Sequence, residues 1–192
     1  MADQGKIFVI SGPSGAGKSS LIRDALKDMK GFVKSLSVTT RPMRKNEKKN
    51  KHYRFISEPQ FQSLIEEDKL LEWADYCGYL YGTPVDFVIE KIKQGINVIL
   101  EIEVKGAMKV KKKISDAYMI FITTTSVEEL ERRLLGRNTD DRSQIEKRIE
   151  VAEEELKYTK YYDCIIVNNN YNETLLNLKA VLNQEKGGKH FD

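Results

Sequence analysis

A glycine-rich turn followed by Lys-Ser lies near the start of the chain. The segment Val9–Ser20 has the sequence VISGPSGAGKSS, in which four residues separate Gly12 from Gly17, and Lys18 and Ser19 follow directly. This is the spacing of a P-loop, a backbone cradle for phosphate groups. Its glycines let backbone N–H groups point inward, its lysine reaches the β- and γ-phosphates, and its serine hydroxyl binds Mg²⁺. The motif predicts a site for a nucleoside triphosphate with its magnesium ion.

The flanks of the motif match what a P-loop needs. Lys6–Ile10 is an apolar run that predicts a buried strand, and Ser20–Leu26 has the apolar spacing of a helix. Such a helix would direct its positive N-terminal end at the bound anion. A purely structural glycine turn is the alternative, and these flanks count against it. The residues expected around the phosphates are Gly12, Pro13, Ser14, Gly15, Ala16, Gly17, Lys18, Ser19 and Ser20, with Ser19 as the metal ligand.

The composition is typical of one globular α/β domain. The 192 residues are 40% hydrophobic and 32% charged, with a net charge of +3. The longest apolar run, Ala117–Ile122, is far too short to span a membrane, and the first residues lack the features of a signal peptide. We therefore expect a cytoplasmic protein with no membrane partner.

Cysteine and histidine do not form a metal-binding pattern in this sequence. Cys77 and Cys164 are far apart, and His52 and His190 are too isolated to form a ligand set. We expect two reduced thiols, no disulfide and no zinc site.

Positive charge is concentrated in one segment. Residues 41–54 contain seven basic residues and one acidic residue, Glu47, which gives a local charge of +6. The basic residues are Arg41, Arg44, Lys45, Lys48, Lys49, Lys51 and Arg54. Three explanations remain open: attraction of phosphorylated small molecules, a solvated surface loop, or a nucleic-acid contact. The nearby P-loop favours the first, and we expect no nucleic-acid partner.

Capping signals and apolar runs divide the rest of the chain into strands and helices. Strands are expected at Leu70–Tyr76, Asn97–Glu101, Tyr118–Thr123 and Cys164–Val167. The first three helices are expected from Ser57 to Asp68, from Thr83–Asp86 to Gln94 with Pro84 at the first helical position, and at about Val104–Ile114. The last three are expected after a capping box of Ser126 and Glu129, from Ser143 to about Tyr158, and after Asn172 as the cap.

This order of elements predicts a fold. Alternating strands and helices favour an α/β, three-layer architecture, with a parallel sheet that carries ligands at the carboxyl ends of its strands. Residues 37–83 break the rhythm with short strand-like pieces and one helix, which indicates an inserted substrate-binding subdomain. Residues 127–159 have the pattern of a helical hairpin, as expected of a mobile lid. The chain would then form a single domain, 1–192, whose core comprises about 1–36, 84–126 and 160–192.

Four blocks of the sequence resemble the guanylate kinase family, and the resemblance covers nearly the whole chain. They are Gly12–Leu21, Ser37–Arg44, Leu71–Ala74 followed by Tyr79–Thr83, and Arg133–Arg137 with Arg148. Together and in this order they are highly specific. The resemblance implies transfer of the γ-phosphoryl group of MgATP to GMP or dGMP, giving ADP and GDP or dGDP, in purine nucleotide metabolism. It also implies a P-loop core, a GMP-binding subdomain at 37–83 and a lid at 127–159.

The resemblance assigns the GMP phosphate to Arg41, Arg44, Tyr53 and Tyr81. Two guanidinium groups can grip a dianionic phosphate, and tyrosine hydroxyls can add donors. The alternatives are exposed surface charge for the arginines and core packing for the tyrosines.

Glu72 is expected to select the base. Guanine presents N1–H and N2–H₂ as adjacent donors that one carboxylate can accept, whereas adenine has a lone pair at N1. Ser37 and Thr83 would complete the recognition of guanine. The alternative for Glu72 is an exposed position on a short strand.

Glu101 and Glu103 are further acidic candidates for substrate contacts. Glu101 ends an apolar strand where P-loop enzymes place an acidic group near Mg²⁺ or its waters, and Glu103 is expected to follow on the same face by strand alternation. The family usually has aspartate at the second position, so the contact of Glu103 with guanine or water is open. Asn46, Asn50 and Asn138 also replace glycines that are common in the family, with effects the sequence does not determine.

The resemblance places Arg133, Arg137 and Arg148 in the lid and Asn168 near adenine. Phosphoryl transfer needs little covalent help, so Lys18 and these arginines would stabilise charge on the phosphates. No general base is required, because the GMP phosphate is already an anionic nucleophile. Pairing with glutamates on the helix surface is the alternative for each lid arginine.

Two other functions remain as alternatives. A guanylate-kinase-like scaffold would use the monophosphate pocket to hold a phosphorylated peptide, but it has no use for Lys18, Ser19 or three lid arginines. A kinase for another nucleoside monophosphate is disfavoured by Glu72 and Ser37. Neither the oligomeric state nor the preference between GMP and dGMP follows from the sequence.

Overall fold

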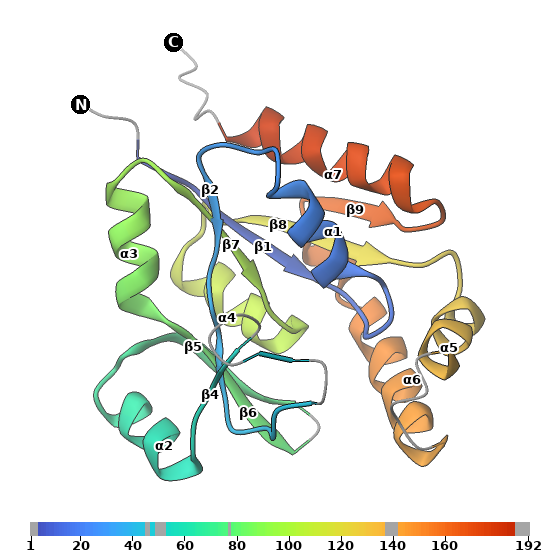
Figure 1. The fold of residues 1–192 in the computed structure, drawn as a ribbon, viewed down its shortest axis with the longest axis horizontal. Coiled ribbons are helices and arrows are strands. Elements are labelled where there is room, and N and C mark those ends of the chain that lie inside the picture. Colours follow the sequence, from blue (N-terminus) through green and yellow to red (C-terminus); the bar gives the residue numbers. More distant parts are fainter. Residues whose placement is uncertain (1–3, 45–46, 49–52, 77, 137–141, 187–192) are drawn as a thin grey trace.

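The computed structural model describes residues 4–44, 47–48, 53–76, 78–136 and 142–186, which form two sheets with helices around them (Figure 1). The larger sheet has five parallel strands in the order β2-β7-β1-β8-β9. Its strands are β1 (Ile7–Ser11), β2 (Phe32–Lys34), β7 (Asn97–Glu101), β8 (Tyr118–Thr123) and β9 (Cys164–Val167). The predicted α/β architecture with a parallel core sheet is confirmed.

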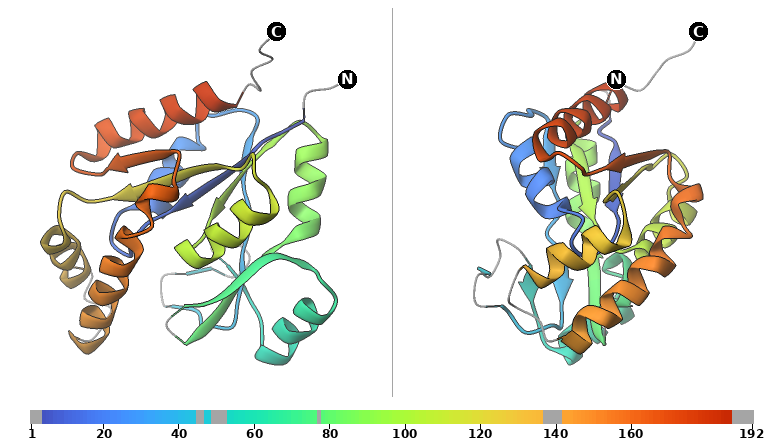
Figure 2. Two further views of the ribbon diagram at one scale, coloured as in Figure 1. Left: turned by 180° about the vertical axis from the view of Figure 1, so that it is seen from behind. Right: turned by 90° about the vertical axis from the view of Figure 1, so that its right-hand side faces the viewer.

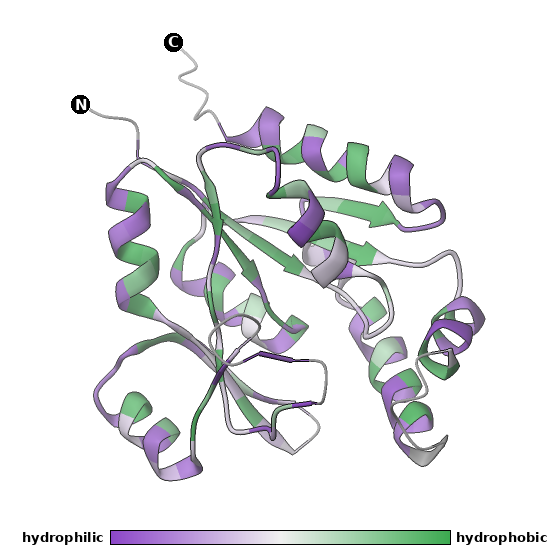
Figure 3. Ribbon diagram, viewed as in Figure 1, coloured by the Kyte–Doolittle hydropathy of each residue, from purple (hydrophilic) through white to green (hydrophobic). Residues whose placement is uncertain are grey.

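Helices cover both faces of this sheet (Figure 2). Phe8 and Ile10 of β1 belong to the core cluster under α1 and α7, while Ile7 and Val9 belong to the cluster under α3 and α4. Central strands that are apolar on both sides are what a parallel sheet between two helical layers requires, and Figure 3 shows this apolar character along the strands. The helices are α1 (Lys18–Ala25), α3 (Val85–Lys93), α4 (Val104–Lys113) and α7 (Tyr171–Glu185).

The second sheet lies at the lower left of Figure 1 and has four strands in the order β4-β3-β6-β5. Val38, Phe61 and Leu70 form a small separate core between this sheet and its helix. The helix begins with the capping box of Ser57 and Gln60 that the sequence predicted. The elements are β3 (Val38–Thr39), β4 (Arg54–Phe55), α2 (Glu58–Glu66), β5 (Leu70–Tyr76) and β6 (Tyr79–Pro84).

Two helices at the lower right of Figure 1 match the predicted helical hairpin. They are α5 (Val127–Leu135) and α6 (Arg142–Leu156), which pack against one another. Leu130 of α5 and Ala152 of α6 join the same core cluster as Ala16 of the P-loop. A short 3₁₀ helix, Thr159–Tyr161, then leads into β9. This pair of helices is therefore packed directly against the phosphate loop.

Helix starts are where the predictions differ most from the structure. Pro84 is not the first helical residue: it ends β6, where it pairs with Leu70, and the helix begins at Val85. Asn172 is not the cap of α7, because Asn170 accepts the N–H of Asn172 at 3.0 Å. Neighbouring residues of equal capping ability compete, and the end of the preceding strand decides between them.

One further start is corrected, and another is confirmed in part. α6 begins at Arg142, so Ser143 lies inside the helix rather than before it. Ser126 does cap α5, since its Oγ accepts the N–H of Glu129 at 3.3 Å. The carboxylate of Glu129 turns instead to arginines of the same helix, so the capping box is only half formed.

Cys164 is a free thiol, as expected, whereas Cys77, His52 and His190 lie outside the described residues. Within the described part of the chain, no helix is both long enough and apolar enough to cross a lipid bilayer.

Candidate active site

The P-loop turns between β1 and α1 at the carboxyl end of the core sheet. Gly12, Gly15 and Gly17 have φ angles of 135°, 95° and 91°, in the region that favours glycine. A Cβ on Gly12 would lie 1.9 Å from the carbonyl oxygen of Ile122, and one on Gly17 would lie 2.6 Å from Nδ2 of Asn168. The turn and the groups packed against it therefore both require these glycines.

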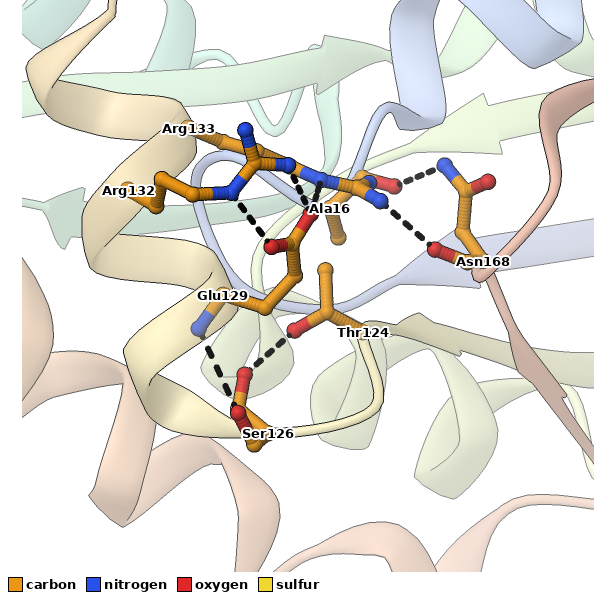
Figure 4. Close-up of polar contacts among 7 residues, drawn as sticks. All are labelled: Ala16, Thr124, Ser126, Glu129, Arg132, Arg133 and Asn168. Atoms are coloured by element: carbon orange, nitrogen blue, oxygen red, sulfur yellow. Dashed lines mark hydrogen bonds and ion pairs between the residues drawn. The ribbon is translucent and has the colours of Figure 1, made fainter.

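Two side chains brace the backbone of this loop. Lys18 Nζ donates to the carbonyl oxygens of Gly12 and Pro13, the latter at 2.9 Å. Asn168, which follows β9, donates from Nδ2 to the carbonyl oxygen of Ala16 at 2.7 Å (Figure 4). The sequence placed Asn168 only near adenine. Its bond to the loop is a structural role that the sequence reasoning missed, and its contact with adenine stays a prediction.

Ser19 and Glu101 form the candidate metal-binding part of the site. Ser19 Oγ donates to Oε1 of Glu101 at 2.5 Å, and Lys34 pairs with Oε2 of the same carboxylate. Burial alone would raise the pKa of Glu101, but Lys34, Ser19 and Lys18 together hold it below its usual value. Glu101 is therefore ionised at neutral pH.

The donor atoms of this pair suit Mg²⁺. A hydroxyl and a carboxylate are the hard oxygen ligands that Mg²⁺ prefers, and the ion commonly takes its other ligands from phosphates and water. Among the described residues, no cluster of three or more acidic, histidine or cysteine side chains offers a closed metal cage. The residues fit an ion that is shared with a phosphate ligand.

Arg41 lies at the centre of a second anion site, on the four-stranded sheet. Its side chain is buried, with 8% of the residue exposed, and its Nε donates to the hydroxyl of Tyr81 at 3.2 Å. Its guanidinium carbon lies 5.4 Å from the ring centre of Tyr53, and the rings of Tyr53 and Tyr81 are 5.9 Å apart. Burial, and then the charge of Glu101, raise the pKa of Tyr53, so its hydroxyl stays protonated.

Glu47 is the residue of this site that the sequence reasoning missed. Its carboxylate accepts two hydrogen bonds from the Arg41 guanidinium, at 2.8 and 3.0 Å, and another from the backbone N–H of Arg44 at 2.8 Å. The structure thus brings Arg41, Tyr53 and Tyr81 together. Arg44 joins them through its backbone N–H, and this residue is exposed. The only sequence signal was an isolated acidic residue inside a basic run.

Glu72 is buried rather than exposed on the surface. Only 4% of the residue is exposed, and Thr83 Oγ1 donates to its Oε1 at 2.7 Å. Burial, together with the smaller effect of the charge of Glu103, raises the pKa of Glu72 to about 7, although the hydrogen bond from Thr83 lowers it. Val38 pairs with Gly82, so Ser37 lies next to Thr83 at the end of this ladder. The three predicted base-recognition residues are therefore neighbours.

Glu103 was predicted to follow Glu101 on the same face of the strand, and this prediction is wrong. β7 ends at Glu101, and Glu103 caps α4, where its carboxylate accepts the N–H groups of Lys105 and Gly106. Burial raises the pKa of Glu103 as well. The side chain is used at a helix N-terminus, where a negative charge is favourable.

Gly106 is a second residue that sequence reasoning missed. A Cβ at this position would lie 2.5 Å from Oε2 of Glu72 and 3.2 Å from Oε1 of Glu103. The first turn of α4 therefore packs closely against the carboxylate of Glu72. Lysines hold this helix to β5, since Lys109 and Lys113 donate to the carbonyl oxygens of Trp73 and Leu71 at 2.5 and 2.8 Å.

Two of the predicted lid arginines reach the P-loop region. Arg133 donates to Glu129 at 2.7 Å and to the carbonyl oxygen of Asn168 at 2.9 Å (Figure 4). Arg148 Nη1 donates to Ser14 Oγ at 3.1 Å. The surface pairing considered as an alternative does occur for Arg133 and Glu129, together with the contact to Asn168. Arg137, like Asn46, Asn50 and Asn138, lies outside the described residues.

The P-loop and the four-stranded sheet are linked through the segment that follows β7. Glu101 bonds to Ser19 at the P-loop, and Glu103, two residues further on, caps the helix whose Gly106 lies against Glu72. The two sites are therefore connected through one short segment of the chain. Such an arrangement can bring two phosphorylated ligands together while Lys18, Arg133 and Arg148 supply positive charge.

Comparisons with known proteins agree with this geometry. The guanylate kinase family model matches residues 4–185. The guanylate kinase of Syntrophomonas wolfei is 41% identical over 186 residues, which cover 97% of this chain and 95% of the relative. That of Rubrobacter xylanophilus is 46% identical over 168 residues, or 88% of each chain. The crystal structure of guanylate kinase from Anaplasma phagocytophilum has a TM-score of 0.83 and 31% identity, over 97% of this chain and 89% of that one. The chain therefore belongs to the guanylate kinase family.

Proposed function

We propose that this chain transfers the γ-phosphoryl group of ATP, bound with Mg²⁺, to GMP or dGMP, giving ADP and GDP or dGDP in purine nucleotide metabolism. The observation that carries the proposal is the link between the P-loop and the Glu72 site, in which Glu101 bonds to Ser19 and Glu103 caps the helix whose Gly106 lies against Glu72. Phosphoryl transfer depends mainly on positioning and on electrostatic stabilisation, and these two sites together supply both.

The proposal divides the single domain into three working parts. The four-stranded sheet with α2, residues 37–83, would bind GMP. Helices α5 and α6, within residues 127–159, would form the lid. The remaining residues, about 1–36, 84–126 and 160–192, would form the core that carries the P-loop.

The GMP site would recognise the phosphate and the base with separate groups. Arg41, Arg44, Tyr53 and Tyr81 would hold the phosphate dianion through charged and hydroxyl donors. The carboxylate of Glu72 would accept N1–H and N2–H₂ of guanine, with Ser37 and Thr83 beside it and Glu103 on the neighbouring helix. Adenine would face the buried carboxylate with a lone pair and leave it unpaired, which is a strong basis for discrimination.

The ATP site would use the backbone of the P-loop and fixed positive charge. Ser19 is the proposed metal ligand, with Glu101 near the ion or its waters. Bound Mg²⁺ would neutralise charge on the β- and γ-phosphates. Lys18, Arg133 and Arg148 would stabilise charge on the transferring group, and Arg137 is proposed for the same role by resemblance alone. The GMP phosphate is itself the nucleophile, so no side chain has to remove a proton.

An active kinase is favoured over a non-catalytic phosphopeptide scaffold because the P-loop geometry is intact around Lys18 and Ser19. A nucleic-acid partner is not needed to explain the basic segment, since Arg41 lies inside the proposed phosphate site. We place the reaction in the cytoplasm, in keeping with the free thiol of Cys164.

The test is a coupled ADP-release assay with GMP, dGMP, AMP, CMP and UMP offered separately at saturating MgATP. Turnover is expected with the guanine nucleotides and only at background level with the others. The Lys18→Met variant is the control, because loss of one preorganised charge should lower kcat on the order of a hundredfold or more. Equal turnover of AMP and GMP by the wild type would refute the proposed substrate.

A further inference from the structure

Lys34 is a charged residue of the site that the reaction described above does not use. It is the last residue of β2, the edge strand of the core sheet, and its side chain reaches the neighbouring strand to pair with Oε2 of Glu101. The side chain of Glu101 is 9% exposed and that of Lys34 is 32% exposed. The pair is therefore largely covered by protein, where an ionised carboxylate needs a partner.

Both oxygens of Glu101 are occupied in this arrangement. Oε1 accepts the hydroxyl of Ser19, and Oε2 accepts the ammonium group of Lys34. Lys18 also acts on Glu101, but its effect is smaller than that of Lys34, and it donates to the carbonyl oxygens of Gly12 and Pro13. The main positive charge at Glu101 is thus the ammonium group of Lys34, which is covalently attached to the chain and forms a tether.

This tether has a consequence for metal binding. A free divalent cation that approached Glu101 in the nucleotide-free protein would have to displace an ammonium group that cannot diffuse away. It would also face the charge of that group at close range, and this repulsion is only weakly screened in a covered site. A cation that arrives with a triphosphate brings its own negative charge and does not meet this barrier.

We propose that Lys34 is the resident counter-ion of Glu101: it positions the Ser19–Glu101 pair when no nucleotide is bound, and it prevents that pair from taking a divalent cation alone. The inference rests on the proposed function, in which the cation enters this site together with ATP. Lys34 acts through Glu101 and is a positioning residue, since no contact with a substrate is assigned to it.

The test measures metal binding to the nucleotide-free, full-length protein, with Mn²⁺ as the probe and electron paramagnetic resonance as the readout. The variants are Lys34→Met, which removes the charge, and Lys34→Arg, which retains it. Lys179→Met is the matched control, because it removes the charge of another ion-paired lysine, with Asp28, on the surface of α7. We expect Lys34→Met to bind Mn²⁺ about tenfold or more tighter than the wild type, and the two other variants to bind it as the wild type does.

A double variant locates the gain. Adding Glu101→Gln to Lys34→Met should return Mn²⁺ binding to the wild-type level if the ion binds at Glu101. Tighter binding that persists in the double variant, or Lys34→Met binding no tighter than the wild type, would overturn the proposal.

A second measurement covers the case in which Lys34→Met is poorly folded. Its thermal unfolding midpoint should fall without divalent ions and recover when Mg²⁺ is added, because the ion replaces the lost charge. Lys34→Arg should show neither effect, and a midpoint of Lys34→Met that Mg²⁺ leaves unchanged would contradict the inference. These measurements use no GMP or ATP. The inference about Lys34 can therefore fail while the phosphotransferase assay succeeds, and it can hold while that assay fails.

Discussion

Glu47 lies across the guanidinium group of Arg41, with Nη2–Oε1 and Nη1–Oε2 distances of 2.8 and 3.0 Å. Arg41 also donates from Nε to Tyr81 and from Nη1 to the carbonyl oxygen of Pro42. These contacts use four of the five N–H donors that a guanidinium group has. The carboxylate of Glu47 thus lies where a phosphate gripped by Arg41 would bind.

A first prediction follows for Glu47→Gln. The GMP phosphate would no longer compete with a carboxylate for Arg41, so GMP should bind more tightly, by on the order of 1 kcal/mol or about fivefold in Kd. Isothermal titration calorimetry with GMP measures the change. Glu90→Gln, which removes an exposed glutamate paired with Lys91, serves as the control and should leave Kd unchanged. Weaker GMP binding by Glu47→Gln would mean that Glu47 holds Arg41 ready for the phosphate instead of competing with it.

Arg41 and Arg44 should differ in their effects on GMP binding. Arg41 is buried against the rings of Tyr53 and Phe55, so Arg41→Ala should remove a charge-assisted contact worth roughly 1.5 to 3 kcal/mol. Arg44 is exposed, so Arg44→Ala should cost less. Arg41→Lys keeps the charge but loses the planar fork, and should recover only part of the affinity. Calorimetric titration of Arg41→Ala, Arg41→Lys and Arg44→Ala with GMP compares their Kd values. Unchanged affinity in both alanine variants would rule out the phosphate clamp.

The sequence predicted most of the fold because the central strands are long and apolar. The bounds expected for Asn97–Glu101 and Tyr118–Thr123 agree with the structure, because apolar runs of this kind are typical of strands buried on both faces. The bounds expected for Cys164–Val167 agree as well, although this strand lies at the edge of the sheet and is partly exposed. The strand Phe32–Lys34 was not predicted. It has three half-buried residues at the edge of the sheet, which is too short a run to show a period of two.

The candidate site was predictable where its residues form a local motif, and less so where packing creates it. The P-loop has a fixed spacing that the sequence shows directly. Gly106 and Glu72 are far apart in the chain and meet only because α4 packs on β5 through Lys109 and Lys113. The sequence shows Glu47 only as an acidic residue in a basic segment. Its bidentate pair with Arg41 depends on the path of the loop between the two residues. Contacts of this kind need the fold before they can be recognised.

Gly106→Ala is expected to weaken guanine recognition without weakening ATP binding. Alanine is intrinsically more favourable than glycine within a helix, so the change should not weaken α4 itself. Its Cβ would instead lie 2.5 Å from Oε2 of Glu72 and push that carboxylate away from its place beside Thr83. We expect KM for GMP to rise by about tenfold, because a misplaced charged acceptor costs on the order of 1 to 3 kcal/mol. Steady-state kinetics with GMP and with ATP as the varied substrate separates the two effects.

A double-mutant cycle shows whether Gly106→Ala acts through Glu72. If it does, Gly106→Ala should have little further effect on KM for GMP when it is added to Glu72→Gln. Additive effects in the double variant would place the damage elsewhere in α4.

Glu72 should make GMP binding depend on pH. Burial raises the pKa of Glu72 to about 7, so in the free protein the carboxyl group is mainly protonated at pH 5 to 6. Guanine offers hydrogen-bond donors, which only the ionised carboxylate can fully accept, so binding must release that proton. The affinity for GMP should therefore rise with pH up to about 7 and level off above it. Calorimetry from pH 5.5 to 8.5, in buffers of different ionisation enthalpy, measures both the affinity and the proton release.

Glu72→Gln separates this effect from the titration of the GMP phosphate, whose second pKa is about 6. The variant keeps the titration of the phosphate and loses that of the carboxyl group, so its pH dependence should be shallower and its proton release at pH 7 much smaller. Its kcat/KM for GMP should also fall far more than its affinity for ATP, because the new NH₂ group faces a guanine donor. The raised pKa of Glu72 also makes stability depend on pH. The folded protein binds the proton of the Glu72 carboxyl group more tightly than the unfolded chain does, so this group stabilises the fold at low pH. That contribution is lost as the pH rises through about 7. A wild type and variant with identical pH profiles for GMP would show that Glu72 does not contact the base.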